Sequence, residues 1–251
     1  MNPTIAGYYA TRVYLPLSSL SRALRRFSRR LRGHSDEFLQ STGLRKVPWR
    51  SCTALSLPRI WEVKKANGNV RLSELAILSA VAATSPNGSN IFEIGTFDGR
   101  TTLNLALSAP AQCHIFTLDL PPDQATKYRI IEGERHMVRK PVPGARYEKY
   151  RATHPEAIGR IHQLLGDSAT FDYAPFENSC SLVFVDGSHA YEYVKSDSEA
   201  ALRMVHSGGV VLWHDYGIWE GVTNALEELE QREHLGLGNI RGTSLVFWKK
   251  R

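Results

Sequence analysis

The sequence predicts an α/β fold in which helices cover both faces of a mostly parallel sheet. From about residue 72 onward, short apolar runs alternate with longer segments of helical periodicity. Turns rich in glycine separate these segments, and strands that alternate with helices form parallel βαβ units. The length of 251 residues and an apolar content of 42% suit a core that is stable without disulfides or structural metal.

Each element is predicted from its own pattern. Five short apolar runs predict strands over residues 91–94, 115–118, 182–185, 210–213 and 244–248. Apolar residues three and four positions apart predict helices over residues 72–84, 100–109 and 191–206 and around residues 222–229. Residues 121–160, with two proline-containing turns, interrupt this alternation and are interpreted as an insertion over the sheet edge.

Charge divides the chain into regions. Residues 1–35 hold seven arginines and no acidic residue, whereas residues 36–251 hold 24 basic and 25 acidic residues. The net charge of +6 therefore belongs to a basic N-terminal arm, and the main domain lacks the basic stripe of a nucleic-acid enzyme. We divide the chain into this arm (1–35), an irregular segment (36–71) and a main domain (72–251).

The arm carries an apolar stripe at helical spacing, formed by Leu20, Leu24, Phe27 and Leu31, with arginines on its other side. A stripe of this kind most often packs on its own domain or on a second subunit. Packing on a second subunit would make the protein a homo-oligomer. It also suits peripheral contact with an anionic membrane surface. A mitochondrial transit segment, which is likewise Arg-rich and acid-free, is a further alternative.

The three cysteines, Cys52, Cys113 and Cys180, are far apart and form no Cys-x-x-Cys motif. Their number and spacing favour a reducing compartment, so we expect a cytoplasmic protein. No apolar run is long enough for a membrane-spanning helix, and the N-terminus lacks the compact apolar region of a secretory signal.

A glycine turn follows the first strand of the main domain and opens a helix. Gly95 allows a sharp turn and close approach of the backbone to a ligand, and Gly99 allows the helix and the strand to pack closely. The N–H groups at the start of the helix suit a carboxylate or a phosphate. Glu93 lies at the strand end, where its carboxylate is placed for an ammonium group.

Two further acids extend this ligand site. Asp119 ends the next strand, where a carboxylate is placed for two ribose hydroxyls. Asp167, followed by Ser168, is placed for an adenine amino group, although loop aspartates also stabilise turns. Phe97 stands where a dinucleotide motif has its second glycine, so an adenosine with a small zwitterion fits better than a pyrophosphate.

Two strands end in carboxylates that would meet at the same edge of the sheet. Asp186 ends the strand over 182–185, and Asp215, preceded by His214, ends the strand over 210–213. Two carboxylates repel unless a proton or a cation lies between them, so a divalent metal is the natural occupant. Each aspartate alone could instead cap the following helix.

These motifs, in this order over residues 72–251, resemble the class I S-adenosylmethionine-dependent methyltransferases. Within that class the chain is similar to the metal-dependent small-molecule O-methyltransferases of the catechol and macrolide-sugar types. The resemblance implies a Rossmann-like sheet of seven strands with the last strand antiparallel. It implies that the cofactor is held by Glu93, Gly95, Thr96, Gly99, Thr101, Asp119, Asp167 and Ser168.

The resemblance also implies a metal and a base. In that family an aspartate at a strand end binds Mg²⁺, and a lysine or histidine three residues later is the general base; Asp186 and His189 have this spacing. An acidic or amide pair of metal ligands ends the next strand, where this chain has His214 and Asp215. His214 departs from the pattern, and because imidazole suits transition metals, the expected ion is either Mg²⁺ or a transition metal.

The implied reaction is methyl transfer from S-adenosylmethionine to a hydroxyl group of a small molecule, such as a sugar, a catechol or a natural-product alcohol. The basic insertion at 121–160 either recognises an anionic substrate or is a solvated, lid-like loop. Tyr216 and Trp219 either wall the acceptor pocket or belong to the core. An NAD-dependent oxidoreductase and a non-catalytic cofactor-binding or assembly module of the same fold are the alternatives.

Overall fold

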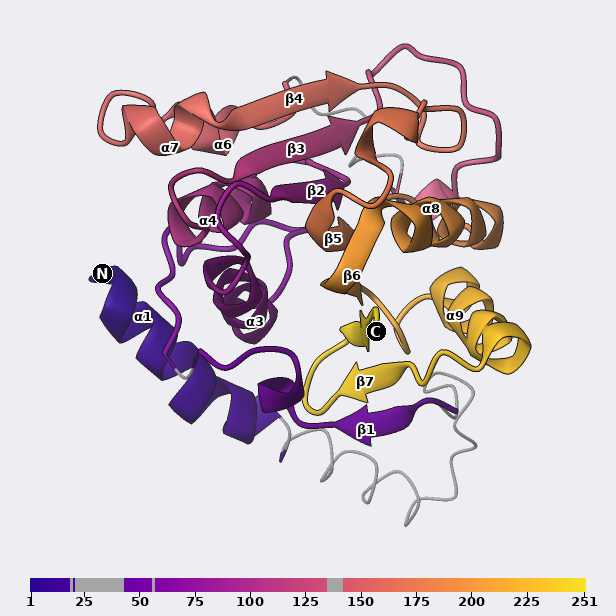
Figure 1. Cartoon of the computed structure of the whole chain (residues 1–251), viewed down its shortest axis with the longest axis horizontal. Coiled ribbons are helices and arrows are strands. Elements are labelled where there is room, and N and C mark those ends of the chain that lie inside the picture. Colours follow the sequence, from indigo (N-terminus) through magenta and orange to yellow (C-terminus); the bar gives the residue numbers. More distant parts are fainter. Residues whose placement is uncertain (19, 21–42, 56, 135–141) are drawn as a thin grey trace.

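The computed structural model describes residues 1–18, 20, 43–55, 57–134 and 142–251. It contains a single eight-stranded sheet in the order β1-β7-β8-β6-β5-β2-β3-β4 (Figure 1). The strands are β1 Arg45–Val47, β2 Asn90–Ile94, β3 His114–Asp119, β4 Ile161–Leu165, β5 Cys180–Val185, β6 Val205–Trp213, β7 Gly238–Ile240 and β8 Val246–Lys249.

The sheet is mostly parallel, as predicted. Neighbouring strands from β4 across to β6 pair in parallel, whereas β8 is antiparallel to both β6 and β7. The prediction of seven strands is wrong by one, because β1 pairs in parallel with β7 and extends the sheet. This strand comes from the segment interpreted as irregular, where three residues are too few to show a strand periodicity.

Helices cover both faces of the sheet. One face carries α3 and α4 and the other carries α8 and α9, so that the sheet lies between two helical layers (Figure 1). These helices are α3 Leu72–Ala83, α4 Arg100–Ser108, α8 Tyr191–Met204 and α9 Glu220–Glu233. The shorter helices are α1 Pro3–Tyr9, η1 Ala10–Tyr14, η2 Trp49–Ser51, η3 Glu132–Glu134, α6 Ala145–Glu148, α7 Pro155–Gly159 and η4 Ala174–Phe176.

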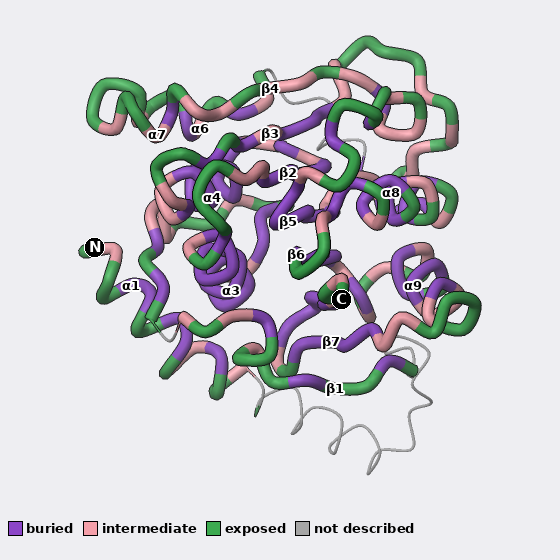
Figure 2. The backbone as a smooth tube through the Cα atoms, in the orientation of Figure 1, coloured by how far each residue is buried: buried purple, intermediate pink, exposed green. Residues whose placement is uncertain are grey.

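Each helical layer buries its apolar side against the sheet. Leu75 and Leu78 of α3 belong to one core cluster, and Val194 of α8 and Leu226 of α9 belong to the other. Strand β5 is buried along its whole length, and β2 is buried after its first residue (Figure 2). Burial on both faces explains why these strands are mostly apolar in the sequence.

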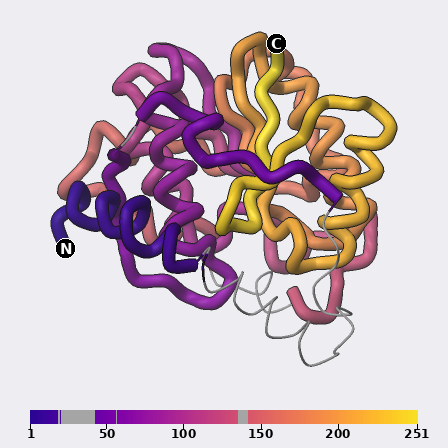
Figure 3. Tube along the Cα trace, turned by 90° about the horizontal axis from the view of Figure 1, so that it is seen from below, coloured from indigo at the N-terminus to yellow at the C-terminus, as the bar shows by residue number. Residues whose placement is uncertain are grey.

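The N-terminal residues form a helix that packs on the domain. The helix α1 and the π-helical η1 run along the surface next to α3, as the view from below shows (Figure 3). Ala6, Ala10 and Leu15 of this segment are buried in the same core cluster as α3. The predicted stripe lies outside the described residues except for Leu20, which is exposed. Among the described helices, none is both long enough and apolar enough to cross a membrane.

Candidate functional site

A cavity opens at the carboxyl ends of the parallel strands. Its volume is about 810 Å³ when the space at its mouth is included. The loops after β2, β3, β4 and β5 all contribute to its wall. Of the residues predicted from the sequence, six line this cavity, namely Gly95, Asp119, Asp167, Ser168, Asp186 and His189. Doubly wound sheets bind their ligands at this edge.

Gly95 lets the first loop lie directly against the loop that follows β5. Its φ of 102° is a conformation that side chains disfavour, and an added Cβ would lie 2.1 Å from the carbonyl oxygen of Asp186. Phe97, two residues later, also has a positive φ, 50°, which is unusual for a bulky residue. Strained backbone of this kind tends to occur at ligand sites, and Phe97 lines the cavity.

Asp119 holds this loop in place. Its Oδ2 accepts a hydrogen bond of 2.6 Å from the backbone N–H of Phe97, and its Oδ1 accepts one of 2.8 Å from Leu120. A carboxylate has about four acceptor positions. Asp119 can therefore fix the glycine loop and at the same time accept hydrogen bonds from a ligand in the cavity.

Asp167 performs a similar function in the loop after β4. Its Oδ2 accepts a hydrogen bond of 2.6 Å from the backbone N–H of Lys127, and its Oδ1 accepts one from Ala169. The first bond ties the insertion to the loop after β4, and the second makes a local turn. Asp167 is therefore a turn residue that also lines the cavity, next to Ser168.

The other predicted cofactor residues do not line the cavity. Glu93 is fully buried, and its Oε2 accepts hydrogen bonds of 2.5 Å from Thr102 and 2.6 Å from Thr117. Burial raises the pKa of Glu93 to about 8, although the two threonine hydroxyls act in the opposite direction. Thr96 also bonds to Thr117, with an oxygen–oxygen distance of 2.7 Å, and Thr101 is buried in the first turn of α4.

Gly99 permits a close contact other than the predicted one. It is the N-cap residue of α4 and has a φ of 84°, and an added Cβ would lie 2.7 Å from the Cα of Gly144 and 2.7 Å from the ring of Tyr147. The expected contact between helix and strand is therefore wrong, because the neighbour of Gly99 is the segment around α6. Gly99 instead lets the insertion pack on the start of α4.

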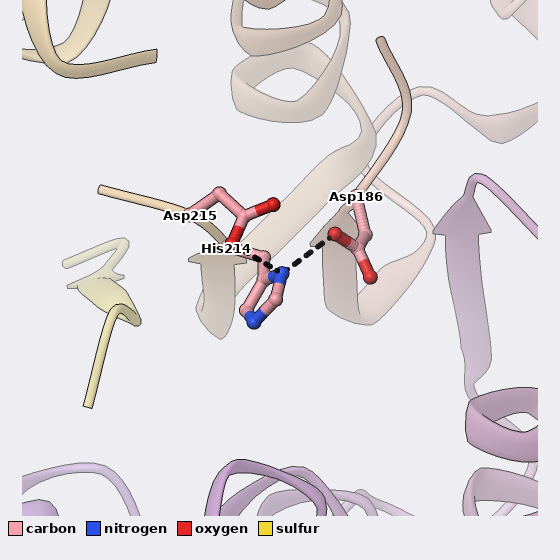
Figure 4. A group of neighbouring side chains, drawn as sticks. All are labelled: Asp186, His214 and Asp215. Carbon is pink, nitrogen blue, oxygen red and sulfur yellow. Dashed lines mark hydrogen bonds and ion pairs between the residues drawn. The ribbon is translucent and has the colours of Figure 1, made fainter. Parts of the chain in front are cut away.

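The two strand-end aspartates meet around His214. Asp186, His214 and Asp215 each offer one atom that could bind a metal, and these three atoms lie within 4.8 Å of one another (Figure 4). His214 Nδ1 is 2.8 Å from Asp186 Oδ1 and 3.3 Å from Asp215 Oδ1. Asp215 adopts a φ of 62°, a left-handed conformation that aspartate tolerates better than most residues.

The fully buried Glu74 of α3 holds the opposite side of the His214 ring. His214 Nε2 is 3.2 Å from Glu74 Oε2, and Glu74 Oε1 accepts hydrogen bonds from the backbone N–H and the hydroxyl of Ser244. A carboxylate that accepts the second N–H of a histidine is the usual outer partner of a metal-ligating imidazole. The donor set of two carboxylates and one oriented imidazole therefore fits a divalent metal.

Opposing effects act on the pKa values of this group. Burial alone would lower the pKa of His214, but the charges of Asp186, Asp215 and Glu74 raise it well above its ordinary value. Burial raises the pKa of Asp186, whereas His214 and His189 together lower the pKa of Asp215 in spite of burial. The carboxylates thus attract positive charge to this end of the sheet, whether it is a proton or a metal ion.

His189 lies between two carboxylates. Its Nδ1 is 2.6 Å from Glu134 Oε2, and its Nε2 is 2.8 Å from Asp215 Oδ2. The ring stacks on Trp219 with a centroid distance of 4.6 Å. Burial lowers the pKa of His189, but its hydrogen bonds to Asp215 and Glu134 outweigh burial and raise the pKa to about 9.

Glu134, in η3 of the insertion, is buried against the loop after β5. Besides the imidazole, it accepts hydrogen bonds of 2.8 Å from the hydroxyl of Ser188 and 2.8 Å from the backbone N–H of His189. Three donors from the loop after β5 thus converge on one carboxylate, which fixes the position of His189. Of the two predicted aromatic residues, Trp219 stacks on His189 at the site, whereas Tyr216 is buried in the core and its hydroxyl donates a hydrogen bond to Glu227.

Glu74 and Glu134 were not predicted as site residues. Glu74 lies within a helical apolar pattern and Glu134 lies within a charged insertion, so neither has a motif or a strand end beside it. An acid at an otherwise apolar helix position was the one signal that could have indicated Glu74.

Part of the chain resembles a known family of domains. Residues 92–216 match the family model described as a methyltransferase domain. No curated protein matches the chain. Solved structures that resemble it include the calicheamicin methyltransferase CalS11, with 17% identity over 70% of this chain and 77% of that chain and a TM-score of 0.54.

Two further structures have a similar fold. The S-adenosylhomocysteine-bound methyltransferase PaMTH1 of Podospora anserina has 14% identity over 74% of this chain and 81% of that chain, with a TM-score of 0.53. The O-methyltransferase NovP has 16% identity over 72% and 80%, with a TM-score of 0.52. Residues 92–216 therefore resemble a methyltransferase domain, and the chain has the fold of these methyltransferase structures.

Proposed function

We propose that the protein transfers the methyl group of S-adenosylmethionine to a hydroxyl oxygen of a small molecule, with His189 as general base. The observation that carries this proposal is the position of His189. Its ring lies at the cavity, held through Nδ1 by Glu134, and its Nε2 points to the strand-end carboxylate of Asp215. The names of CalS11 and NovP, a methyltransferase and an O-methyltransferase, support the same reaction class.

The cofactor would occupy the cavity between the glycine loop and Asp167, with its ribose at Asp119. S-Adenosylmethionine supplies an electrophilic methyl group on a sulfonium. Asp119 would accept hydrogen bonds from the ribose hydroxyls, and Gly95 leaves room for the methionine part. Phe97, which replaces a glycine of the dinucleotide motif, disfavours NAD.

The acceptor oxygen would lose its proton to Nε2 of His189. Glu134 accepts the Nδ1–H and so leaves Nε2 as the basic nitrogen of the neutral ring. The share of neutral His189 rises as the pH approaches its pKa of about 9. The oxygen then forms a bond to the methyl carbon as the carbon–sulfur bond breaks, which leaves S-adenosylhomocysteine. Positioning of the two reactants supplies much of the rate.

A divalent metal would be held by Asp186, His214 and Asp215, with Glu74 orienting His214. Such an ion would lower the pKa of the acceptor hydroxyl and orient it. The two carboxylates suit Mg²⁺, whereas the imidazole favours a transition metal. A chelator should therefore lower the rate of methyl transfer. The ion that restores this rate decides between Mg²⁺ and a transition metal.

The test is a methyl-transfer screen with labelled S-adenosylmethionine over pooled sugars, catechols and natural-product alcohols, with and without a chelator. We expect label in at least one hydroxylated acceptor for the wild type and little for His189→Ala. His206→Ala is the matched control, because His206 lies near the opposite end of β6 from His214. Binding of NAD in place of S-adenosylhomocysteine, or transfer at the wild-type rate by His189→Ala, would contradict the proposal.

A further inference from the structure

The N-terminal helix presents its small residues to the core and its large apolar residues to the solvent. Ala6 and Ala10 are fully buried, whereas Ile5 is 62% exposed and Tyr8 is 56% exposed. The exposed apolar residues of this segment are Met1, Ile5, Tyr8, Tyr9, Leu17 and Leu20. The outer side of α1 is accordingly exposed along its length (Figure 2). Six exposed apolar side chains on one short segment indicate an interaction surface.

This surface is fixed and cannot turn inward. An added Cβ on Gly7 would lie 1.7 Å from the carbonyl oxygen of Pro58, so the helix backbone packs directly on that segment. The backbone N–H of Ile60 donates a hydrogen bond of 3.0 Å to the carbonyl of Pro3. The small buried residues permit this close packing, and a rotation that buried Ile5 or Tyr8 would lose it.

The charge of the region indicates what covers this surface. Residues 1–35 contain seven arginines and no acidic residue, and the first acid of the chain is Asp36. Arg12 is exposed on the helix itself, and the other six arginines lie outside the described residues. A binding partner with negative charge is therefore favoured for the exposed side of this helix. A second copy is disfavoured, because a symmetric dimer through this surface would bring the Arg12 side chains of two helices together with no acid among residues 1–18 to pair with them.

We propose that the N-terminal helix docks the protein on the surface of an anionic lipid bilayer. Aliphatic side chains such as Ile5 and Leu17 would enter the boundary between headgroups and acyl chains, and the tyrosines would lie at headgroup level. The arginines would be attracted by the negative surface potential. This inference rests on different residues from the proposed function and does not depend on it.

The test is co-sedimentation of the full chain with vesicles of phosphatidylcholine alone or mixed with phosphatidylserine. We expect binding to the mixed vesicles, weaker binding at high salt, and little binding to phosphatidylcholine alone. The double variant Ile5→Glu/Tyr8→Glu should lower binding to the mixed vesicles by at least about tenfold, since it places two charges on the apolar face.

Leu165→Glu is the matched control, because Leu165 is 56% exposed on β4, at the opposite edge of the sheet from β1. Its binding should equal that of the wild type, and thermal melts should show that both variants are folded. Absence of wild-type binding to the mixed vesicles would overturn the proposal. So would equal binding by the double variant, or a wild-type dimer that the double variant dissociates while vesicles bind neither protein.

Discussion

Replacing Asp119 by asparagine tests the cofactor site most sharply. The substitution keeps the shape of the side chain but removes the charge that accepts the N–H groups of Phe97 and Leu120 at 2.6 and 2.8 Å. A hydrogen bond to a charged group contributes roughly 1.5–3 kcal/mol. The loss of one such bond to the ribose predicts roughly 10- to 150-fold weaker binding of S-adenosylhomocysteine.

Isothermal titration calorimetry with S-adenosylhomocysteine measures this change directly. Asp123→Asn is the matched control, because Asp123 is an exposed acid in the same loop that does not line the cavity. Thermal melts separate weaker binding from a disordered loop. If Asp119→Asn is folded and binds S-adenosylhomocysteine as tightly as the wild type, the assignment of this cavity to the cofactor is refuted.

Three further substitutions test other parts of the structure. His189→Ala should lower kcat by about 10²–10⁴ while calorimetry with S-adenosylhomocysteine shows little change in affinity, and an unchanged kcat would exclude the base. Glu134→Gln should lower kcat about tenfold or more, because it removes the charge that holds His189 Nδ1; steady-state rates measure this, and a wild-type rate would argue against a positioning role. Asp197 is fully buried, and burial raises the pKa of its carboxyl to about 7, above its unfolded value of 3.8. The folded state therefore keeps the proton longer, so the free energy of unfolding should fall as pH rises from about 4 to about 7. Asp197→Asn should remove this fall in urea titrations, and a pH dependence equal to that of the wild type would contradict the assignment.

The sheet could largely be predicted from the sequence because its central strands are buried on both faces. Strands such as β2 and β5 are mostly apolar, and their sequence pattern reveals them. Strands β1 and β7 each have three residues, which is too short for any periodicity to appear. Their pairing depends on a contact between segments almost two hundred positions apart, and local patterns carry no information about it.

The residues of the site, too, could be predicted from the sequence only in part. Parallel strands end at one edge, so strand-end reasoning led us to expect that Asp186 and Asp215 would meet, and the structure places them around His214. Glu74 and Glu134 reach the site from a helix and from the insertion, through tertiary packing alone. Glu93 ends a strand too, yet its carboxylate turns to two threonines beneath the glycine loop.

The most direct test of the central claim is the identity of the atom that receives the methyl group. The wild-type protein would be incubated with ¹³C-methyl-labelled S-adenosylmethionine and the acceptors, and the product examined by ¹³C NMR. The account predicts a methyl ether resonance that is absent when Asp186→Asn or His189→Ala replaces the wild type. A labelled methyl on nitrogen or sulfur, or no transfer to any hydroxylated acceptor by a protein that binds S-adenosylhomocysteine, would contradict it.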